Sequence, residues 1–254
     1  MTLSLSVATW NIHKGFSQFN RHMMVHELRE RLRELSVDIV FLQEVQGLHL
    51  RHAERHADWP SQPQHEFLAE DVWANHSYGS NMVYDHGHHG NAILSRFPIE
   101  HEHNQDVTHL RFDKRGLLHC SVKLPQLVLP LHCVCVHLSL FARSRRLQLD
   151  ALASRIEDLV PAAAPLLIAG DFNDWRNRAD DLLADRLGLV EVFAGAVRRP
   201  SRSYPAALPL FRLDRIYQRG LQVVAAQVHA GRPWSSISDH AVLSAELQVR
   251  TGVP

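Results

Sequence analysis

Residues 165–174 read Pro165-Leu166-Leu167-Ile168-Ala169-Gly170-Asp171-Phe172-Asn173-Asp174, a short apolar run that ends in a glycine and a polar turn. An apolar run of this length bounded by turn residues is typical of a buried strand. The alternation from Asp171 to Asn173 then places a carboxylate and an amide on one side of the chain, where the two can hold a water and a phosphate oxygen together. An ordinary Asn/Asp turn gives the same pattern, so this stretch alone leaves both interpretations open.

Similar apolar runs, rich in β-branched residues and separated by turn residues, recur along the chain. They predict strands at 3–10, 38–42, 78–84, 91–95, 117–124, 131–137, 166–169, 213–217, 223–229 and 241–247. Helical spacing of leucine and isoleucine predicts helices at 23–35 and 143–159, and a shorter helix is expected at 178–187. Many strands with few helices indicate an α/β (α+β) protein with mixed sheets in layers.

The composition, 45% hydrophobic and 21% charged over 254 residues, is that of an ordinary soluble globular protein. Without a linker-like stretch, one domain is expected over 1–250, with a short tail at 251–254. The N-terminal residues lack a basic leader and are expected to form a strand. The most apolar segment, 124–141, is interrupted by prolines and histidines, so no stable membrane insertion is expected and a cytoplasmic location is the default.

Lys and Arg together number 27, as do Asp and Glu, so the chain has no overall positive field to hold a polyanion. Long nucleic acid is therefore not favoured by net charge, although a local patch such as Arg143, Arg145 and Arg146 remains compatible with it. Cys120, Cys133 and Cys135 all fall in predicted strands. They are interpreted as buried, reduced thiols in preference to a metal site.

Other polar groups also lie at the ends of predicted strands. Asn11 and Glu44 follow two of them, and Asp239-His240 precedes another. A rigid sheet commonly presents catalytic groups from such ends, although a turn former and a solvated strand terminus explain Asn11 and Glu44 equally well. Histidine beside acidic groups can act as a general base or stabilise charge as imidazolium. Asp214 could orient His240, or simply pair with a neighbouring arginine.

In this order the motifs resemble the endonuclease/exonuclease/phosphatase superfamily, the fold of DNase I, over nearly the whole chain. The resemblance rests on Thr9-Trp10-Asn11, Gln43-Glu44, residues 90–95, Val136-His137-Leu138, Gly170-Asp171-Phe172-Asn173 and Ser238-Asp239-His240. The chain looks most like compact stand-alone bacterial members. The resemblance implies a four-layer αββα sandwich, in which two mixed sheets pack face to face and helices cover the outer faces.

The resemblance also implies the roles of the site residues. Glu44 would be the main Mg²⁺ ligand, with Asn11 and Asp239 helping to hold the metal or phosphate, and Mn²⁺ could replace Mg²⁺. Asp171 would align or deprotonate the attacking water, or protonate the leaving oxygen. His240, oriented by Asp214, would stabilise the developing charge or act as a base. His137, Asn173, Arg115 and Asn91 would contact the phosphate or the substrate.

One departure from the DNase-like pattern concerns His137. An acidic residue that pairs with this histidine in those nucleases is replaced here by Gly79, Ser80 and Asn81, which follow Tyr78. The cluster His86, His88 and His89 is interpreted as a polar loop beside the site, with a second metal site or a substrate clamp as the alternatives.

These features together predict a Mg²⁺-dependent phosphoesterase that hydrolyses a phosphodiester by metal-assisted, in-line attack of water. Its substrate would be nucleic acid or a phospholipid or other small phosphodiester, the latter hinted at by Pro209-Leu210-Phe211. A phosphomonoesterase and a non-catalytic binding module on the same fold are the rivals. No obligate protein partner is evident.

Overall fold

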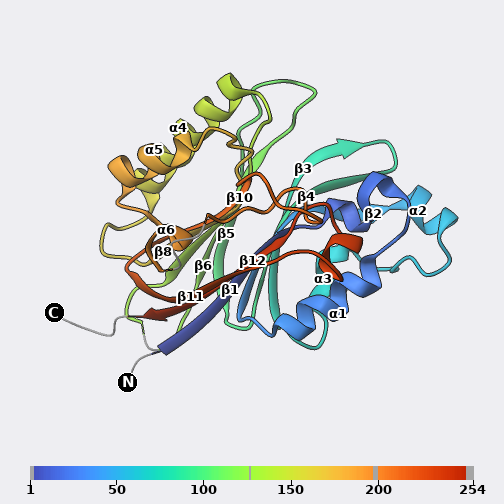
Figure 1. Ribbon diagram of the computed structural model, residues 1–254, viewed down its shortest axis with the longest axis horizontal. Coiled ribbons are helices and arrows are strands. Elements are labelled where there is room, and N and C mark those ends of the chain that lie inside the picture. Colours follow the sequence, from blue (N-terminus) through green and yellow to red (C-terminus); the bar gives the residue numbers. More distant parts are fainter. Residues whose placement is uncertain (1–2, 126, 197–199, 250–254) are drawn as a thin grey trace.

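The computed structural model describes residues 3–125, 127–196 and 200–249. In Figure 1 two sheets lie between helices, with α1 (Val25–Leu35) and α3 (Gln64–Ala69) on one side and α4 (Ala142–Leu159) and α5 (Arg178–Leu187) on the other. This is the four-layer sandwich of two mixed sheets that the sequence predicts. The tail expected at 251–254 lies outside the described residues.

The first sheet contains six strands in the order β11-β12-β1-β2-β4-β3. β1 and β2 run parallel, and the other neighbouring pairs are antiparallel. The strands are β1 (Leu3–Asn11), β2 (Ile39–His49), β3 (Asn75–Tyr84), β4 (Gly87–Ser95), β11 (Leu221–His229) and β12 (Val242–Val249).

The second sheet also contains six strands, in the order β5-β6-β7-β8-β10-β9. Its one parallel pair is β7 and β8, so each sheet is mixed and carries a parallel pair near its centre. The strands are β5 (Ile99–Asp106), β6 (Gly116–Val122), β7 (Leu131–His137), β8 (Leu166–Asp171), β9 (Val190–Glu191) and β10 (Asp214–Arg219).

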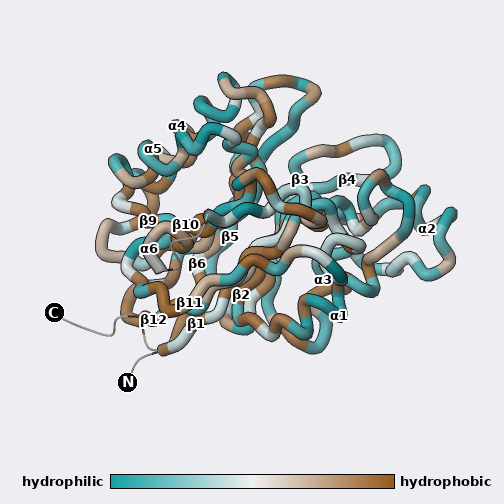
Figure 2. The backbone as a smooth tube through the Cα atoms, viewed as in Figure 1, coloured by the Kyte–Doolittle hydropathy of each residue, from teal (hydrophilic) through white to brown (hydrophobic). Residues whose placement is uncertain are grey.

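Three buried clusters hold these layers together. Side chains alternate along a strand, so Phe41 of β2 and Leu167 of β8 face the space between the sheets. Val40 faces α1 and α3, and Ile168 faces α4 and α5. Central strands are therefore buried on both faces, which is why they appear in the sequence as continuous apolar runs. Figure 2 shows hydrophobic central strands and largely hydrophilic outer helices.

The two predicted long helices are present close to their expected bounds. α1 buries Val25, Leu28 and Leu32 and ends where Ser36 adopts a left-handed conformation, with φ 51°. α4 buries Leu149, Leu152 and Ile156 against the second sheet. The remaining helical segments are short: α2 (Leu50–Arg55), α6 (Val192–Ala196) and three 3₁₀ turns at His13–Gly15, Gln18–Asn20 and Trp234–Ser236.

The three cysteines are free and buried. Burial raises the pKa of each thiol above its ordinary value, so all three are in the neutral form that a core position favours. No helix among the described residues is long and apolar enough to cross a bilayer.

Several strands differ from their predictions. The short strand β9 was not expected, and β4 begins at Gly87, so that His88 and His89, which were expected in a loop, lie on a strand. β2 was expected to end at Leu42 but continues to His49, because the register shifts between Leu42 and Val45 and Glu44 takes a φ of 57°. Glu44 therefore lies on a bulge within a strand, a position that re-aims its side chain. The edge strand β5 was not predicted because its sequence, Ile-Glu-His-Glu-His-Asn-Gln-Asp, is polar, as is common where a strand faces solvent.

Gly170 is required by the close approach of β8 to β7. Its φ is 145°, and a Cβ at this position would lie 1.9 Å from the carbonyl oxygen of Val136. We expect Gly170→Ala to lower the free energy of unfolding by about 3 kcal/mol or more, because strain and a backbone clash add. Urea denaturation checks this value.

Gly188→Ala is the matched control. Gly188 also has a positive φ, 63°, but a Cβ there meets nothing within 4 Å. The expected loss is only about 1 kcal/mol. Equal losses in the two variants would show that the approach of β8 to β7 is not a constraint on the fold.

Candidate active site

The predicted site residues come from both sheets and meet at one end of the sandwich. Asn11 ends β1, His137 ends β7 and Asp171 ends β8, while Asp214 begins β10. In the second sheet the pairing register sets Asp171 beside both His137 and Asp214. Parallel strands end at the same edge of a sheet, so their terminal side chains are brought together without any long loop.

A chain of short contacts joins Glu44 to His240 across the two sheets. The Asn11 amide lies 3.5 Å from Glu44 Oε1 and 3.2 Å from Asp171 Oδ2. Asp171 Oδ2 lies 3.9 Å from His240 Nε2, and His240 Nδ1 lies 2.8 Å from Asp214 Oδ2. Five side chains that are distant in sequence therefore share one site.

His240 and Asp214 form a buried pair. Burial opposes protonation of the imidazole, but the ion pair and hydrogen bond with Asp214, together with Asp171 and Asp239, raise the pKa of His240 to about 10. The backbone also holds this histidine, because Trp10 Nε1 donates to its carbonyl oxygen at 3.0 Å. His240 is therefore an oriented imidazolium at neutral pH.

Asp171 lies at the centre of the site. Burial raises its pKa to about 7, although His240 and a 2.9 Å hydrogen bond from the Asn173 backbone favour the ionised form. A carboxyl group with a pKa near neutrality can both accept and release a proton. His137 lies 3.6 Å away, and burial together with Arg115 lowers its pKa well below the ordinary value, so it is neutral.

Asn173 adopts a left-handed conformation with φ 48°, which turns the chain immediately after β8. One of its amide hydrogens is donated to the Leu138 carbonyl at 3.0 Å, which leaves the second for a ligand. Asp239 adjoins His240 in the chain, and its Oδ1 is 3.2 Å from His13 Nδ1.

The sequence interpretation gave no role to two cationic side chains beside the site carboxylates. His13 pairs with Asp239, which raises the pKa of His13, and Lys14 Nζ lies 3.9 Å from Glu44 Oε2. Both residues have positive φ, so the chain turns sharply after β1 and directs them back over the site. Their position directly after Asn11 was the available signal, but only the fold shows which carboxylates they meet.

Arg115 and Asn91 are placed differently from each other. Arg115 is held by Asp113 at 2.8 Å, and its charge acts on His137 and His89, so it belongs to the His137 side of the site. Asn91 is buried below the site and donates to the carbonyls of Gly116 and Cys135. Its side chain is thus buried and held by backbone carbonyls, so the predicted contact of Asn91 with a substrate has no support in the structure.

The histidine cluster separates because neighbouring residues of a strand face opposite sides. His88 Nδ1 lies 2.9 Å from the Tyr78 hydroxyl. His89 is directed toward the site, where burial and the charges of Lys14 and Arg115 lower its pKa.

In the part of the chain that the structure describes, His137 lacks the acidic partner expected from the DNase-like nucleases. At one of the positions after Tyr78, Asn81 accepts a hydrogen bond from Asn104 at 3.0 Å. Among the described residues, His137 pairs with Asp171 alone.

Two groups of side chains are suited to a metal ion. Asp171, Asp214 and His240 are buried and offer ligand atoms within 4.8 Å of one another, so they could hold a cation. Asn11, Glu44 and Asp239 offer the amide and carboxylate oxygens that Mg²⁺ prefers. In the structure each carboxylate of the second group has a cationic side chain beside it, Lys14 or His13, which shows that this side of the site accommodates positive charge.

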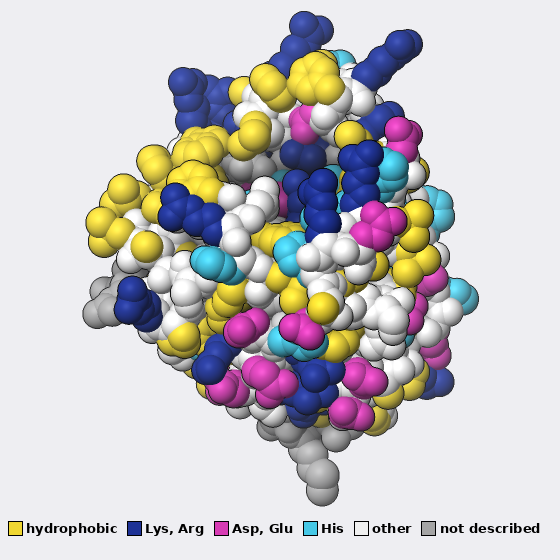
Figure 3. Space-filling model, turned by 90° about the vertical axis from the view of Figure 1, so that its right-hand side faces the viewer, with side chains coloured by type: hydrophobic (Ala, Val, Ile, Leu, Met, Phe, Trp, Pro, Cys, Tyr) yellow, Lys and Arg dark blue, Asp and Glu magenta, His cyan; other side chains and the backbone are white. Residues whose placement is uncertain are grey.

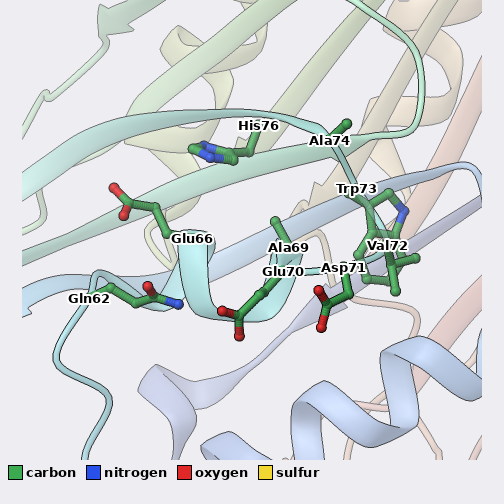
Figure 4. Close-up of a pocket in the computed structure, with 9 residues that line it drawn as sticks. All are labelled: Gln62, Glu66, Ala69, Glu70, Asp71, Val72, Trp73, Ala74 and His76. Atoms are coloured by element: carbon green, nitrogen blue, oxygen red, sulfur yellow. The ribbon is translucent and has the colours of Figure 1, made fainter.

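A cavity of about 430 Å³ lies between α3 and the start of β3, away from the two groups of possible metal ligands (Figure 4). Its lining includes Glu66, Glu70 and Asp71 but none of the predicted site residues. Such an acidic surface repels phosphate esters, so this cavity is not the candidate site.

A family model described as the Endonuclease/Exonuclease/phosphatase family matches residues 8–240, a span that contains every site residue discussed above. The chain therefore belongs to this family, whose members are generally phosphoester hydrolases. The uncharacterized protein YbhP of Escherichia coli K12 is 46% identical over 246 residues, which cover 97% of each chain.

Solved structures confirm the fold. An endonuclease/exonuclease/phosphatase from Beutenbergia cavernae has a TM-score of 0.74 at 20% identity, with 97% of this chain and 72% of that chain covered. The mannosyl-6-phosphatase Bt3783 of Bacteroides thetaiotaomicron has a TM-score of 0.69 at 14% identity, with 96% and 99% covered. At these identities the likeness shows the shared architecture and not a shared substrate.

Asp214→Asn should lower the pKa of His240 by removing the carboxylate that stabilises its charged form. As the pH rises, the imidazole of the variant would then lose its proton at a lower pH than in the parent protein, where the pKa of His240 is about 10. Histidine ring ¹⁵N NMR in the presence of a chelator checks this, with His240→Gln used to assign the signal. Asp150→Asn, on α4 and away from the site, should leave the titration unchanged, and an equally unchanged titration in Asp214→Asn would disprove the pairing.

Proposed function

We propose that the protein is a Mg²⁺-dependent phosphodiesterase that activates water for in-line attack at phosphorus. The supporting observation is the continuous contact path from Glu44 through Asn11 and Asp171 to His240 and Asp214. This path combines an oxygen-rich cation site, a carboxyl group with a near-neutral pKa and an oriented imidazolium. Metal-assisted hydrolysis of a phosphate ester can use all three: the cation and the imidazolium stabilise negative charge, and the carboxyl group accepts a proton.

Glu44, Asn11 and Asp239 would hold the Mg²⁺. This group is preferred to Asp171, Asp214 and His240, because the Asp214–His240 hydrogen bond at 2.8 Å already uses one ligand atom of each residue. When bound, the cation supplies Lewis-acid stabilisation of the negative charge on the phosphate.

The remaining groups act on the substrate and its protons. Asp171 Oδ2 accepts a proton from water as the water oxygen bonds to phosphorus. The ester bond on the opposite side breaks with its electron pair on the leaving oxygen, which takes up a proton from solvent, and Asp171 then releases its proton to solvent. The imidazolium of His240 and the neutral ring of His137 lie 3.9 Å and 3.6 Å from Asp171, where they can donate hydrogen bonds to the phosphate oxygens. The free amide hydrogen of Asn173 adds a further donor.

A phosphomonoesterase is the second candidate. The similar structure of a mannosyl-6-phosphatase favours it, as does the number of positive groups around the site. His240, Arg115 and Lys14 together suit the double charge of a phosphomonoester. Comparing kcat/KM for bis(4-nitrophenyl) phosphate with that for 4-nitrophenyl phosphate distinguishes the two candidates, and a preference for the monoester would replace the proposal.

Glu44→Gln and His240→Ala should each lower kcat/KM for bis(4-nitrophenyl) phosphate by at least about 100-fold, because each removes charge that acts on the transition state. Stopped assays with Mg²⁺, with and without chelator, measure this, and the chelator should abolish the parent activity. Glu54→Gln, an exposed carboxylate on α2, is the matched control and should change kcat/KM by less than about twofold. Full activity in either site variant would rule out the proposed mechanism.

The two possible metal groups are separated by a binding measurement that does not depend on catalysis. Titration calorimetry with Mn²⁺ should show an affinity at least about tenfold weaker for Glu44→Gln, because a neutral amide replaces the negatively charged carboxylate ligand, and little change for His240→Gln. The reverse result would move the ion to Asp171, Asp214 and His240. No binding to the parent protein would instead favour a non-catalytic module on this fold.

A further inference from the structure

The loops of the second sheet that border the active site form a distinct surface, here called the basic rim and defined as segments 107–115, 138–146, 172–178 and 200–213. Each segment directly adjoins a strand end that carries a site residue or its neighbour: Gly116, His137, Asp171 and Asp214. Because β6 and β10 run antiparallel to β7 and β8, all four segments emerge at the same end of the sheet. The rim and the active site therefore share one face of the molecule.

Large hydrophobic side chains are concentrated on this rim. Seven of the 16 exposed large hydrophobic side chains described for the molecule lie in these 39 residues. On one side the rings of Phe112 and Phe141 meet at 5.8 Å, and on the other those of Trp175 and Phe211 meet at 4.8 Å. The remaining three are aliphatic: Leu140 is 57% exposed, Leu208 68% and Leu210 54%. Exposed apolar groups gathered at one place mark an interaction surface.

Charge is segregated on the same rim although the whole chain is neutral. The four segments carry ten Lys and Arg and only two Asp, whereas the rest of the chain has 17 basic and 25 acidic residues. Both rim carboxylates are buried: Asp113 pairs with Arg115 at 2.8 Å and Asp174 with Arg145 at 3.9 Å. The solvent-facing charge of the rim is therefore positive. Figure 3 shows a face on which Lys and Arg surround a hollow, with hydrophobic side chains beside it.

A cavity of about 330 Å³ is lined in part by residues of the rim segments 138–146 and 172–178. It lies between α4 and α5, and four arginines line it together with two carboxylates, of which Asp174 is paired with Arg145: Arg145, Arg146, Arg176, Arg178, Asp174 and Asp181. Its lining thus has a net positive charge. Arginine binds phosphate oxygens through two parallel hydrogen bonds, and a cavity of this size can hold one phosphate headgroup.

We propose that the basic rim docks the protein onto the surface of an anionic phospholipid bilayer, with the exposed rings and leucines entering the headgroup boundary and the arginine-lined cavity receiving a headgroup phosphate. Basic residues around apolar side chains bind anionic membrane surfaces by adding Coulombic attraction to apolar burial. The three leucines favour lipid over single-stranded nucleic acid, since bases stack on aromatic rings and gain little from aliphatic chains. Docking is a property of this surface and does not rest on the proposed catalytic function.

Co-sedimentation with vesicles tests the proposal on the full chain with a chelator present, so that hydrolysis plays no part. We expect binding to vesicles of equal parts phosphatidylglycerol and phosphatidylcholine, and at least tenfold weaker binding to pure phosphatidylcholine. The double variant Leu208→Gln/Leu210→Gln should weaken binding to the phosphatidylglycerol-containing vesicles by at least tenfold, because apolar burial is lost. The double variant Arg146→Gln/Arg176→Gln should weaken binding to the same vesicles by about 10- to 30-fold, because two positive charges are lost.

Matched controls carry the same chemical changes away from the rim. Leu159→Gln, at the far end of α4 where the side chain is 53% exposed, and Arg31→Gln/Arg51→Gln should bind as the parent protein does. Absent binding to phosphatidylglycerol vesicles, or equal weakening by the control variants, would overturn the proposal. Tight binding to a single-stranded oligonucleotide that the leucine variants leave unchanged, together with weak vesicle binding, would assign the rim to nucleic acid instead. Activity on bis(4-nitrophenyl) phosphate, measured separately, shows whether the catalytic proposal fails independently.

Discussion

The hydrogen bond between the Asn11 amide and the Asp171 carboxylate, 3.2 Å long, joins the two sheets within the candidate active site. Asn11 ends the central strand of one sheet and Asp171 a central strand of the other, so the face-to-face packing of the sheets fixes the distance between them. Gly170 makes this arrangement possible, because only a residue without Cβ lets β8 lie so close to β7. The site is thus a property of the core, and its geometry is as rigid as the sandwich itself.

Burying so many ionisable groups is unfavourable unless their charges compensate one another. Here the buried pair is His240 with Asp214, and two partly exposed pairs lie beside it: His13 with Asp239, and Lys14 with Glu44. Asp171 lacks a full partner and keeps a pKa near neutrality, and the neutral His137 avoids adding a further charge. Because the surroundings of Asp171 and His240 shift their pKa values differently, the carboxyl group can exchange protons near neutral pH while the neighbouring imidazole stays charged.

Much of this arrangement could be predicted from the sequence, because central strands buried on both faces appear as apolar runs and their polar ends mark the site. The misses have physical reasons. β5 is a polar edge strand, and the bulge at Glu44 depends on pairing with β4, which no local pattern specifies. The pairing of His13 and Lys14 with site carboxylates was also not predictable, because it links residues up to 226 positions apart through the packing of the sheets.

Net charge was the least informative sequence quantity, since a total of zero conceals a rim with ten basic and two acidic residues. The side chains of the candidate site are fixed by the sheets, and in the reaction proposed above they act on the phosphate group alone, which every phosphate ester shares. Discrimination between substrates must therefore come from the surrounding loops, which contact the rest of the molecule. The basic rim belongs to the loops of the second sheet only. A substrate anchored there would therefore bring its phosphorus into the site from the side on which Asp171 and His137 lie. The other side, where Lys14 and Glu44 lie, remains available to the metal.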